Sequence, residues 1–408
     1  MYKLGINIGE DIIYWYYSTQ QNTLYNTNME PITINETYAN TRKKSLHIRL
    51  SLGMACNYKC GYCSEHPNKN CAVKSAQDYV KFITALKEFV DDKLGTFDKY
   101  GVSFWGGEPL LYMDAIKILT PIIKNVFGSD VELGLCTNGE LLDNDIYDFL
   151  TSNEFRVGVS YDGPGQFVRN KVDVFQPGTL QHSIVRKAMD AELPWYIQPV
   201  FHKHNPSVYE YVTFIRNVFG DNVKIGEMSA MRIYDSNSMT YALDDTQLAN
   251  LPTDIVRVMN DQALRKIIMR PITGALCSFC LNYGGKPLRK THCFVGRDYL
   301  AVDLSGDIWA CHNNIGQLTD EYGDTYKLGS IYTKTYSCPK FVRLTHKMSN
   351  RCEGCLHMHI CRGGCPMTSS TYDNENCKTY YFEKLMVWQM LINCFTGGNL
   401  VSITKEGD

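Results

Sequence analysis

The chain has 408 residues, of which 44% are hydrophobic, and its formal net charge is −2. This length leaves room for roughly two to three domains with a substantial core. Lysine and arginine are spread along the chain, so nucleic acid is an unlikely partner. The N-terminal residues lack a signal-peptide pattern, and no apolar segment is long enough to cross a bilayer. We therefore expect a cytoplasmic protein without a membrane partner.

The chain contains 16 cysteines, which are clustered. Disulfides are typical of small secreted domains, whereas this chain is long and has no signal peptide. Metal binding in a reducing cytoplasm is the better interpretation of these cysteines.

Strands and helices alternate from residue 46 onward, after an irregular N-terminal extension over 1–45 that has one possible strand at 12–18. The pattern predicts strands over 46–53, 102–105, 131–136, 156–161, 195–202 and 223–228. It predicts helices over 74–94, 114–126, 143–150, 179–191 and 207–219. Such alternation indicates parallel β/α units. Six units fit an α/β fold with a partial (β/α)6 TIM-like barrel, open on one side. A further helix is predicted over 246–272, ending at Arg270-Pro271.

Four unusual segments follow the first four predicted strands. They are Cys56–Cys63 with cysteines at 56, 60 and 63, then Trp105-Gly106-Gly107-Glu108-Pro109, Thr137-Asn138-Gly139 and Asp162-Gly163-Pro164. Each of the last three could be an ordinary turn. Function in such barrels collects at the C-terminal ends of the strands. Four such segments in barrel order therefore predict a site at this edge.

Cys56, Cys60 and Cys63 have spacings that let three thiolates converge on one inorganic centre. A [4Fe–4S] cluster takes four ligands, usually cysteine thiolates. Three cysteines leave one iron open to a small molecule. The alternative is a zinc knuckle that takes His66 or Cys71 as its fourth ligand.

Ten of the 16 cysteines lie between Cys277 and Cys377, in a glycine-rich region expected to lack long helices. Domains with a small core often need metal to fold. The spacing C-x12-G-x4-C is followed by C-x2-C-x5-C-x3-C and one last cysteine; the seven positions are 293, 311, 352, 355, 361, 365 and 377. A zinc ribbon from Cys277, Cys280, Cys352 and Cys355 is the alternative, but it leaves the other cysteines unexplained.

The first cysteine motif, with Tyr62 at its aromatic position, and the Gly-Gly-Glu-Pro segment resemble the radical S-adenosylmethionine (SAM) superfamily. The resemblance implies that SAM chelates the open iron and is cleaved reductively to a 5′-deoxyadenosyl radical that abstracts hydrogen. It assigns Gly106, Gly107 and Glu108 to the SAM amino group, since a carboxylate complements an ammonium. It places Ser160 and Arg169 at the SAM carboxylate. The remaining residues of the expected SAM site are Tyr62, Asn138 and Asp162.

The C-terminal array resembles the SPASM domain, which carries two auxiliary [4Fe–4S] clusters. The resemblance implies that Cys293, Cys311 and Cys365 hold the first cluster, with Cys277 or Cys280 as an upstream ligand. It implies that Cys352, Cys355, Cys361 and Cys377 hold the second cluster. The expected domains are an extension at 1–45, the barrel at 46–272, the SPASM domain at 273–380, and a C-terminal helix and tail at 381–408. Cys71, Cys136, Cys338 and Cys394 match no motif, although Cys136 could face the cavity.

The resemblance favours an oxidoreductase that modifies a peptide or protein, by thioether or carbon–carbon crosslinking, epimerisation or oxidation, as in the maturation of ribosomal peptides. His312 stands where sulfatase maturases have an aspartate, and it is a weak catalytic candidate because histidine can take a proton. About 45 residues precede the barrel, too few for a leader-binding domain, so a separate leader-binding protein is possible. A flavodoxin or ferredoxin would supply electrons. The alternatives are a radical enzyme acting on a small molecule or nucleoside, and a non-catalytic zinc-binding scaffold.

Overall fold

The computed structural model describes most of the chain. The described residues are 1–33, 44–63, 76–280, 283–284, 298–315, 325–337, 352–365, 367–368 and 370–406. His66, Cys71, Cys293 and Cys338 lie outside them.

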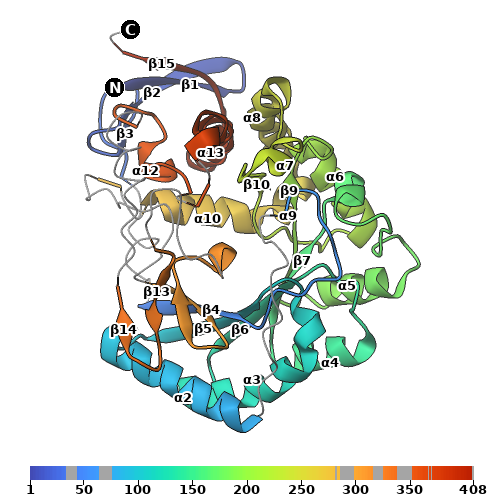
Figure 1. The fold of residues 1–408 in the computed structure, drawn as a ribbon. Coiled ribbons are helices and arrows are strands. Elements are labelled where there is room, and N and C mark those ends of the chain that lie inside the picture. The colour runs from blue at the N-terminus through green and yellow to red at the C-terminus, as the bar shows by residue number, and fades with distance from the viewer. Residues whose placement is uncertain are drawn as a thin grey trace.

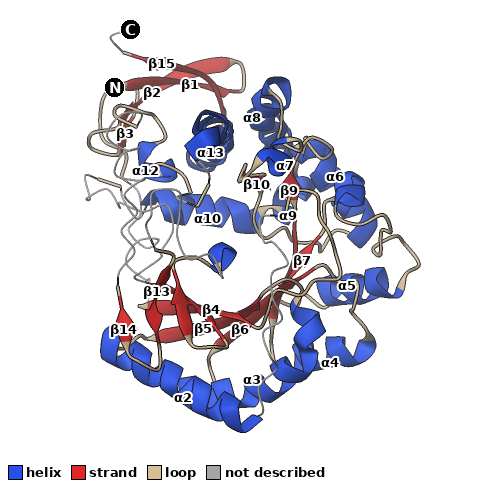
Figure 2. Ribbon diagram, viewed as in Figure 1, coloured by secondary structure: helices blue, strands red, loops and turns tan. Residues whose placement is uncertain are grey.

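A nine-stranded sheet forms the centre of the molecule, in the order β14-β13-β12-β11-β4-β5-β6-β7-β8. Its parallel barrel strands are β4 (Ser45–Ser51), β5 (Lys99–Trp105), β6 (Glu132–Thr137), β7 (Arg156–Ser160) and β8 (Trp195–Gln198). The intervening helices cover the outer side of the sheet (Figures 1 and 2). They are α2 (Ala76–Lys93), α3 (Met113–Phe127), α4 (Asn144–Ser152), α5 (Leu180–Asp190) and α6 (Val208–Phe219). These ten elements confirm the predicted alternation and the partial barrel.

Local chemistry fixes where three of these helices begin. The side chains of Asp143, Thr179 and Ser207 accept hydrogen bonds from the first-turn backbone N–H groups of α4, α5 and α6. Such caps satisfy donors that a helix start leaves unpaired. Leu46, Ile48 and other apolar strand residues are buried in one core beneath the helices. The strand ends therefore have fixed positions relative to one another.

The sixth strand lies later than the sequence predicted. β8 ends before Pro199, which has no N–H to continue the ladder. Two short strands, β9 (Val200–Phe201) and β10 (Ser229–Ala230), then pair in parallel as a separate sheet. Residues 223–228 reach β8 through one isolated bridge, between Ile197 and Ile225. The prediction of a strand over 223–228 is therefore wrong.

The helix predicted over 246–272 is three helices: α8 (Asp245–Asn260), α9 (Gln262–Ile267) and α10 (Met269–Cys280). The Asp261 side chain accepts hydrogen bonds from Ala263 and Leu264 and so starts a new helix. Pro271 is tolerated because it lies in the first turn of α10, where its missing N–H has no helical partner. The helix continues through Cys277 and Cys280 instead of ending at Pro271.

The cysteine-rich region continues the barrel sheet. β11 (Tyr299–Asp303) pairs in parallel with β4, and β12 (Asp307–Trp309), β13 (Lys327–Ser330) and β14 (Thr335–Tyr336) follow in antiparallel order. The region also contains the short helix α12 (Met358–Cys361) and the 24-residue helix α13 (Asp373–Thr396). The expectation that it lacks long helices is wrong, and the C-terminal helix begins before residue 381.

The two ends of the chain share one antiparallel sheet, in the order β15-β1-β2-β3 (Figure 1). Its strands are β1 (Tyr2–Ile8), β2 (Asp11–Ser18), β3 (Thr23–Tyr25) and β15 (Asn399–Lys405). Leu4, Ile6 and Tyr17 pack with Trp388 and Leu391 of α13. The strand predicted at 12–18 is confirmed as β2. β1 and β3 lie where we expected irregular structure, and β1 has a partner strand from the opposite end of the chain. None of the described helices is long and apolar enough to cross a membrane.

Candidate functional site

A cavity of about 400 Å³ lies at the C-terminal ends of the barrel strands. It brings together ten of the site residues expected from the sequence: Cys56, Cys60, Tyr62, Cys63, Gly106, Gly107, Glu108, Asn138, Ser160 and Arg169. Cys136 also lines it. Segments that are more than a hundred residues apart in the chain therefore meet around one space.

The three cysteines of the first motif differ in exposure. Cys56 and Cys60 are partly buried, and burial raises the pKa of each thiol, whereas Cys63 is exposed. In the described parts of the chain, no three Cys, His, Asp or Glu side chains are gathered tightly enough for a single metal ion. These thiols instead lie around a volume large enough for a bigger group. The donor set suits an iron–sulfur cluster, for which thiolate is the usual ligand.

Gly106 and Gly107 hold the strand end directly against the start of the cysteine loop. A Cβ atom at Gly106 would lie 2.0 Å from the carbonyl oxygen of Gly53, and one at Gly107 would lie 2.3 Å from that of Ala55. Gly106 also has a φ of +143°, which side chains rarely adopt. The Glu108 N–H donates to the Ala55 carbonyl at 2.9 Å. The glycines are thus needed for backbone packing as well as for lining the cavity.

Glu108 is buried at the cavity wall and is held by its own neighbours. Its Oε1 accepts hydrogen bonds from Leu110 N at 3.0 Å and Thr137 Oγ1 at 2.6 Å, and its Oε2 accepts from Asn138 N at 2.8 Å. Burial raises the pKa of Glu108, and these three hydrogen bonds oppose the rise. A carboxylate has about four acceptor positions, so one is left for a ligand. Asn138 also donates to Asn57 at 2.8 Å, which ties the cysteine loop to β6.

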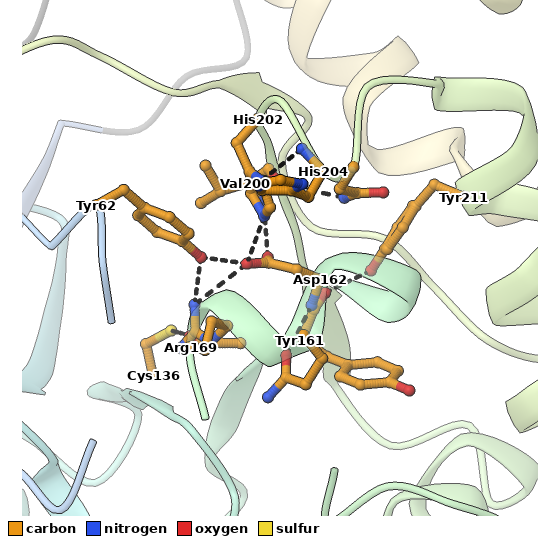
Figure 3. A network of polar contacts seen from close by, with 12 residues as sticks. Tyr62, Cys136, Tyr161, Asp162, Arg169, Val200, His202, His204 and Tyr211 are labelled. Atoms are coloured by element: carbon orange, nitrogen blue, oxygen red, sulfur yellow. Dashed lines mark hydrogen bonds and ion pairs between the residues drawn. The ribbon is translucent and has the colours of Figure 1, made fainter. Parts of the chain in front are cut away.

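Asp162 does not line the cavity but joins three residues that do, Tyr62, Arg169 and Val200 (Figure 3). Its Oδ2 accepts a hydrogen bond from Tyr62 and lies 4.0 Å from Arg169 Nη1 and 3.5 Å from His202 Nε2. Its Oδ1 accepts from Val200 N at 2.9 Å. Arg169 donates to the Tyr62 hydroxyl at 3.0 Å. The Asp162 carboxylate therefore links the cysteine loop, the loop after β7 and the start of β9.

Several lining residues were missed from the sequence: Tyr58, Val200, Ser229, Ala230, Met231, Arg232, Tyr234 and Asn313. Most of them belong to β9, β10 and the segment after β10. The sixth strand was predicted too early in the chain, which explains the omission. The strand found there, β10, ends at Ala230, so residues 231–234 are the ones that follow it. Correct placement of that strand would have identified Arg232 by the strand-end rule.

His312 lies outside the cavity lining found among the described residues, although its neighbour Asn313 belongs to it. The His312 ring contacts the Tyr299 hydroxyl and packs edge-on against Trp105 at 4.3 Å between ring centroids. Burial and, to a lesser extent, Arg49 lower the pKa of His312 to about 3, so the ring is neutral near pH 7. This position gives no support to a catalytic role.

A second group of cysteines lines a small, partly open space of about 50 Å³. Cys352, Cys355, Cys361 and Cys377 line it, together with His357 and Tyr381 among others. Burial raises the pKa of Cys361 to about 11. These are the four residues that the SPASM resemblance assigned to one cluster. Cys352 and Cys355 precede α12, Cys361 is the last residue of α12, and Cys377 lies on α13.

The other expected cluster is partly described. Cys311 and Cys365 are partly buried, and both lie close enough to Tyr234 to affect its pKa, which burial chiefly raises. Cys365 donates its backbone N–H to the Tyr380 hydroxyl at 2.8 Å. Cys277 is partly buried and Cys280 is buried, both on α10. Cys293 lies outside the described residues, so this ligand set stays a prediction.

Comparison with known proteins identifies the class. Residues 50–215 match the family model of the Radical SAM superfamily. These residues therefore form a radical SAM domain, and the chain is an enzyme whose cofactors are a [4Fe–4S] cluster and SAM.

Three further similarities extend over most of the chain. It is 23% identical to the serine-type anaerobic sulfatase-maturating enzyme of Bacteroides thetaiotaomicron, over 91% of this chain and 98% of the relative. Its fold matches a structure of native anSMEcpe with bound AdoMet and Kp18Cys peptide, with a TM-score of 0.66, 18% identity, and coverage of 86% and 99%. It also matches Streptococcus suis SuiB bound to precursor peptide SuiA, with a TM-score of 0.55, 16% identity, and coverage of 90% and 96%.

Proposed function

We propose that this enzyme cleaves SAM in the barrel cavity and uses the resulting radical to modify a side chain or backbone carbon of a peptide or protein. The observation that carries the proposal is the meeting of Cys56, Cys60 and Cys63 with Gly106–Glu108, Ser160 and Arg169 around one cavity. The three thiolates would hold three irons of a [4Fe–4S] cluster. When bound there, the cluster and SAM supply a carbon-centred radical that abstracts hydrogen.

The protein's own residues would bind and orient SAM. Glu108 keeps one acceptor position for the SAM ammonium, and its three internal hydrogen bonds hold the carboxylate in place. Arg169 and Ser160 would take the SAM carboxylate. Asp162 would act as a positioning residue, since it fixes Arg169 and Tyr62 while lying behind the cavity wall. Preorganised charges of this kind reduce the cost of placing a ligand.

A peptide substrate is supported by the likeness to a sulfatase-maturating enzyme and to two structures that contain peptides. The cavity supports it too, since its walls from β10 onward combine Ala230 and Met231 with Arg232 and Tyr234. We assign no proton transfer to His312, whose ring is buried against Tyr299 and Trp105. Thioether formation, carbon–carbon crosslinking, epimerisation and oxidation are the four outcomes that the test below separates.

The C-terminal cysteines would hold two auxiliary [4Fe–4S] clusters. The cavity lined by Cys352, Cys355, Cys361 and Cys377 supports the second of them, because four cysteines gather around one small space. Cys311 and Cys365, together with Cys293 and one cysteine of α10, would hold the first. A low-potential donor such as a flavodoxin or ferredoxin would supply the electrons.

The test of the substrate class uses peptides encoded beside the gene, prepared with deuterium at carbon. The anaerobically reconstituted enzyme is incubated with SAM, a reductant and each peptide. We expect deuterium in 5′-deoxyadenosine and a mass change in one peptide, and tandem mass spectrometry of that peptide identifies the bond formed. Active SAM cleavage with no deuterium transfer from any peptide, but transfer from a deuterated small molecule, would contradict a peptide substrate.

A further inference from the structure

A second cavity, of about 410 Å³, adjoins the first and shares Ser229 and Arg232 with it. Its walls come from the segment around β10, from α10 and from α13, which lie near one another on the open side of the barrel (Figure 1). Much of the lining is apolar: Met228, Pro271, Ala275, Met386, Val387 and Met390. Two arginines, Arg232 and Arg270, stand among these residues. The cavity therefore suits a ligand with an apolar stem and a negative end.

Arg232 is a charged side chain with unused hydrogen-bonding capacity. One terminal nitrogen, Nη2, donates to Glu383 Oε2 at 2.5 Å, and the guanidinium carbon lies 4.1 Å from the ring centroid of Tyr380. The other terminal nitrogen, Nη1, is buried and has no hydrogen-bond partner among the described residues. A buried donor without a partner costs free energy that a ligand would recover.

The carboxylates among the lining residues are too few to neutralise all the cations there, although Arg270, like Glu227, is exposed to water. Arg232 is paired with Glu383, and the Lys384 ammonium donates to the same carboxylate at 3.0 Å. Lys384 also lines this cavity, so three cations face the single buried carboxylate of Glu383. Arg270, which lies on α10, packs over the Tyr196 ring, and its guanidinium carbon is 4.3 Å from the ring centroid. Glu227 lines the cavity as well, but its side chain is exposed to water, which weakens its effect.

We propose that Arg232 and Arg270 bind a carboxylate of the peptide substrate, so that an aspartate or glutamate next to the modified residue anchors the peptide beside the SAM cavity. Guanidinium groups recognise carboxylates through paired, charge-assisted hydrogen bonds. The methionines and Val387 would contact the methylene stem of the acidic side chain. This inference rests on the proposed function and names a feature of its substrate.

The test compares two fluorescein-labelled pentapeptides with blocked ends, identical except for a central glutamate or glutamine. Anisotropy titrations use the full-length reconstituted enzyme with S-adenosylhomocysteine present. We expect the wild-type enzyme to bind the glutamate peptide about tenfold more tightly than the glutamine peptide. Arg232→Gln and Arg270→Gln should each reduce this preference several-fold, whereas Arg186→Gln, an exposed arginine on α5, should leave it unchanged.

Glu383→Gln provides a variant with the opposite expected effect. Removing the internal carboxylate frees Arg232, so the preference for the glutamate peptide should rise, which a misfolded protein would not show. Equal binding of both peptides, or an unchanged preference in both arginine variants, would overturn the inference. Loss of SAM binding in Arg232→Gln with the peptide preference intact would also overturn it, because Arg232 would then serve SAM.

Two further measurements are needed. One distinguishes failure of the carboxylate site from failure of the proposed function, and the other distinguishes a carboxylate ligand from a phosphorylated one. SAM cleavage by the wild-type enzyme is assayed without peptide, as 5′-deoxyadenosine. Cleavage without peptide discrimination rejects the carboxylate site alone, whereas absence of cleavage rejects the proposed function. Inorganic phosphate is used as a competitor, and displacement of the glutamate peptide at lower concentration than acetate requires would point to a phosphorylated ligand and overturn the proposal.

Discussion

The Tyr62 hydroxyl donates a hydrogen bond to the Asp162 carboxylate, a hundred residues further along the chain. Tyr62 lies between two cysteines of the first motif, and Asp162 is fully buried behind the cavity. The same carboxylate lies beside Arg169 and His202 (Figure 3). The cysteine loop is therefore fastened to the strand ends that would bind SAM.

Asp162→Asn tests this connection. The change keeps the shape of the side chain but leaves Arg169 without its buried carboxylate, so we expect a loss of about 3 kcal/mol in unfolding free energy. SAM affinity should fall about tenfold because Arg169 is no longer held. Urea unfolding and equilibrium dialysis measure these quantities.

Asp173→Asn is the control for this change, since Asp173 accepts hydrogen bonds from Tyr161 at 2.8 Å and from Phe175 N at 2.9 Å in the same loop. It should leave SAM affinity within about twofold of the wild type, because its partners do not line the cavity. Equal effects of the two substitutions on SAM affinity would show that Asp162 has no special positioning role.

Gly106→Ala should disrupt the junction between β5 and the cysteine loop. The new Cβ would lie 2.0 Å from the Gly53 carbonyl oxygen, so one of the two backbones must move. We expect a loss of at least about 2 kcal/mol and a lower iron content. Gly178→Ala is a matched control, with φ +100° and open space around the new atom. If both variants retain wild-type iron, the close approach at Gly106 does not determine the geometry of the loop.

The Arg232–Glu383 pair predicts a pH dependence of stability. Burial acts to raise the pKa of Glu383, but Arg232 and Lys384 outweigh it and hold the pKa at about 2. A depressed carboxylate pKa stabilises the folded state above the unfolded value of about 4.5, and this contribution disappears as the pH falls toward 2. The shift corresponds to about 3 kcal/mol.

Glu383→Gln should therefore be less stable than the wild type at pH 7, and the difference should shrink below pH 4.5. Urea unfolding of both proteins at pH 7.0 and pH 3.5 measures the difference. Asp190→Asn, at an exposed aspartate on α5, should change stability little at either pH. A gap between Glu383→Gln and the wild type that stays constant with pH would refute the charged pair.

Cys352→Ala should remove an auxiliary cluster. Cys352 is one of four cysteines around the small C-terminal space, and a cluster that loses a ligand is bound less tightly. Iron analysis should show a loss of about four iron atoms per chain. Cys394→Ala is the control, because Cys394 lies on α13 outside every expected ligand set and contacts Arg265 at 3.8 Å. An unchanged iron content in Cys352→Ala would contradict the assignment of Cys352 as a cluster ligand.

The sequence predicted the elements whose information is local. Strands β4 to β8 carry buried apolar residues, and α4 and α5 between them have polar caps, so their boundaries and periodicities are clear. The strand-end residues of the cavity followed from that order. The sixth strand was misplaced because β9 and β10 have two residues each, too few for a periodic pattern. Arg232, which follows β10, was therefore not predicted as a site residue.

Long-range pairing accounts for the other errors. β1 pairs with β15, so the N-terminal strands are stabilised by a segment at the far end of the chain. Helix α13 buries polar residues such as Glu383, Lys384 and Asn376, so it lacks the apolar stripe that marks a surface helix. These side chains are satisfied by tertiary partners, which local sequence does not display.

The most direct test of the central claim is SAM cleavage by the reconstituted enzyme under reduction. The wild type should form 5′-deoxyadenosine and methionine, and Cys56→Ala/Cys60→Ala/Cys63→Ala should lose this activity while keeping iron in the C-terminal domain. Full 5′-deoxyadenosine formation by the triple variant would contradict the assignment of the radical-generating cluster to this cavity. A colourless wild-type protein with stoichiometric zinc and no reaction with SAM would contradict the enzyme account as a whole.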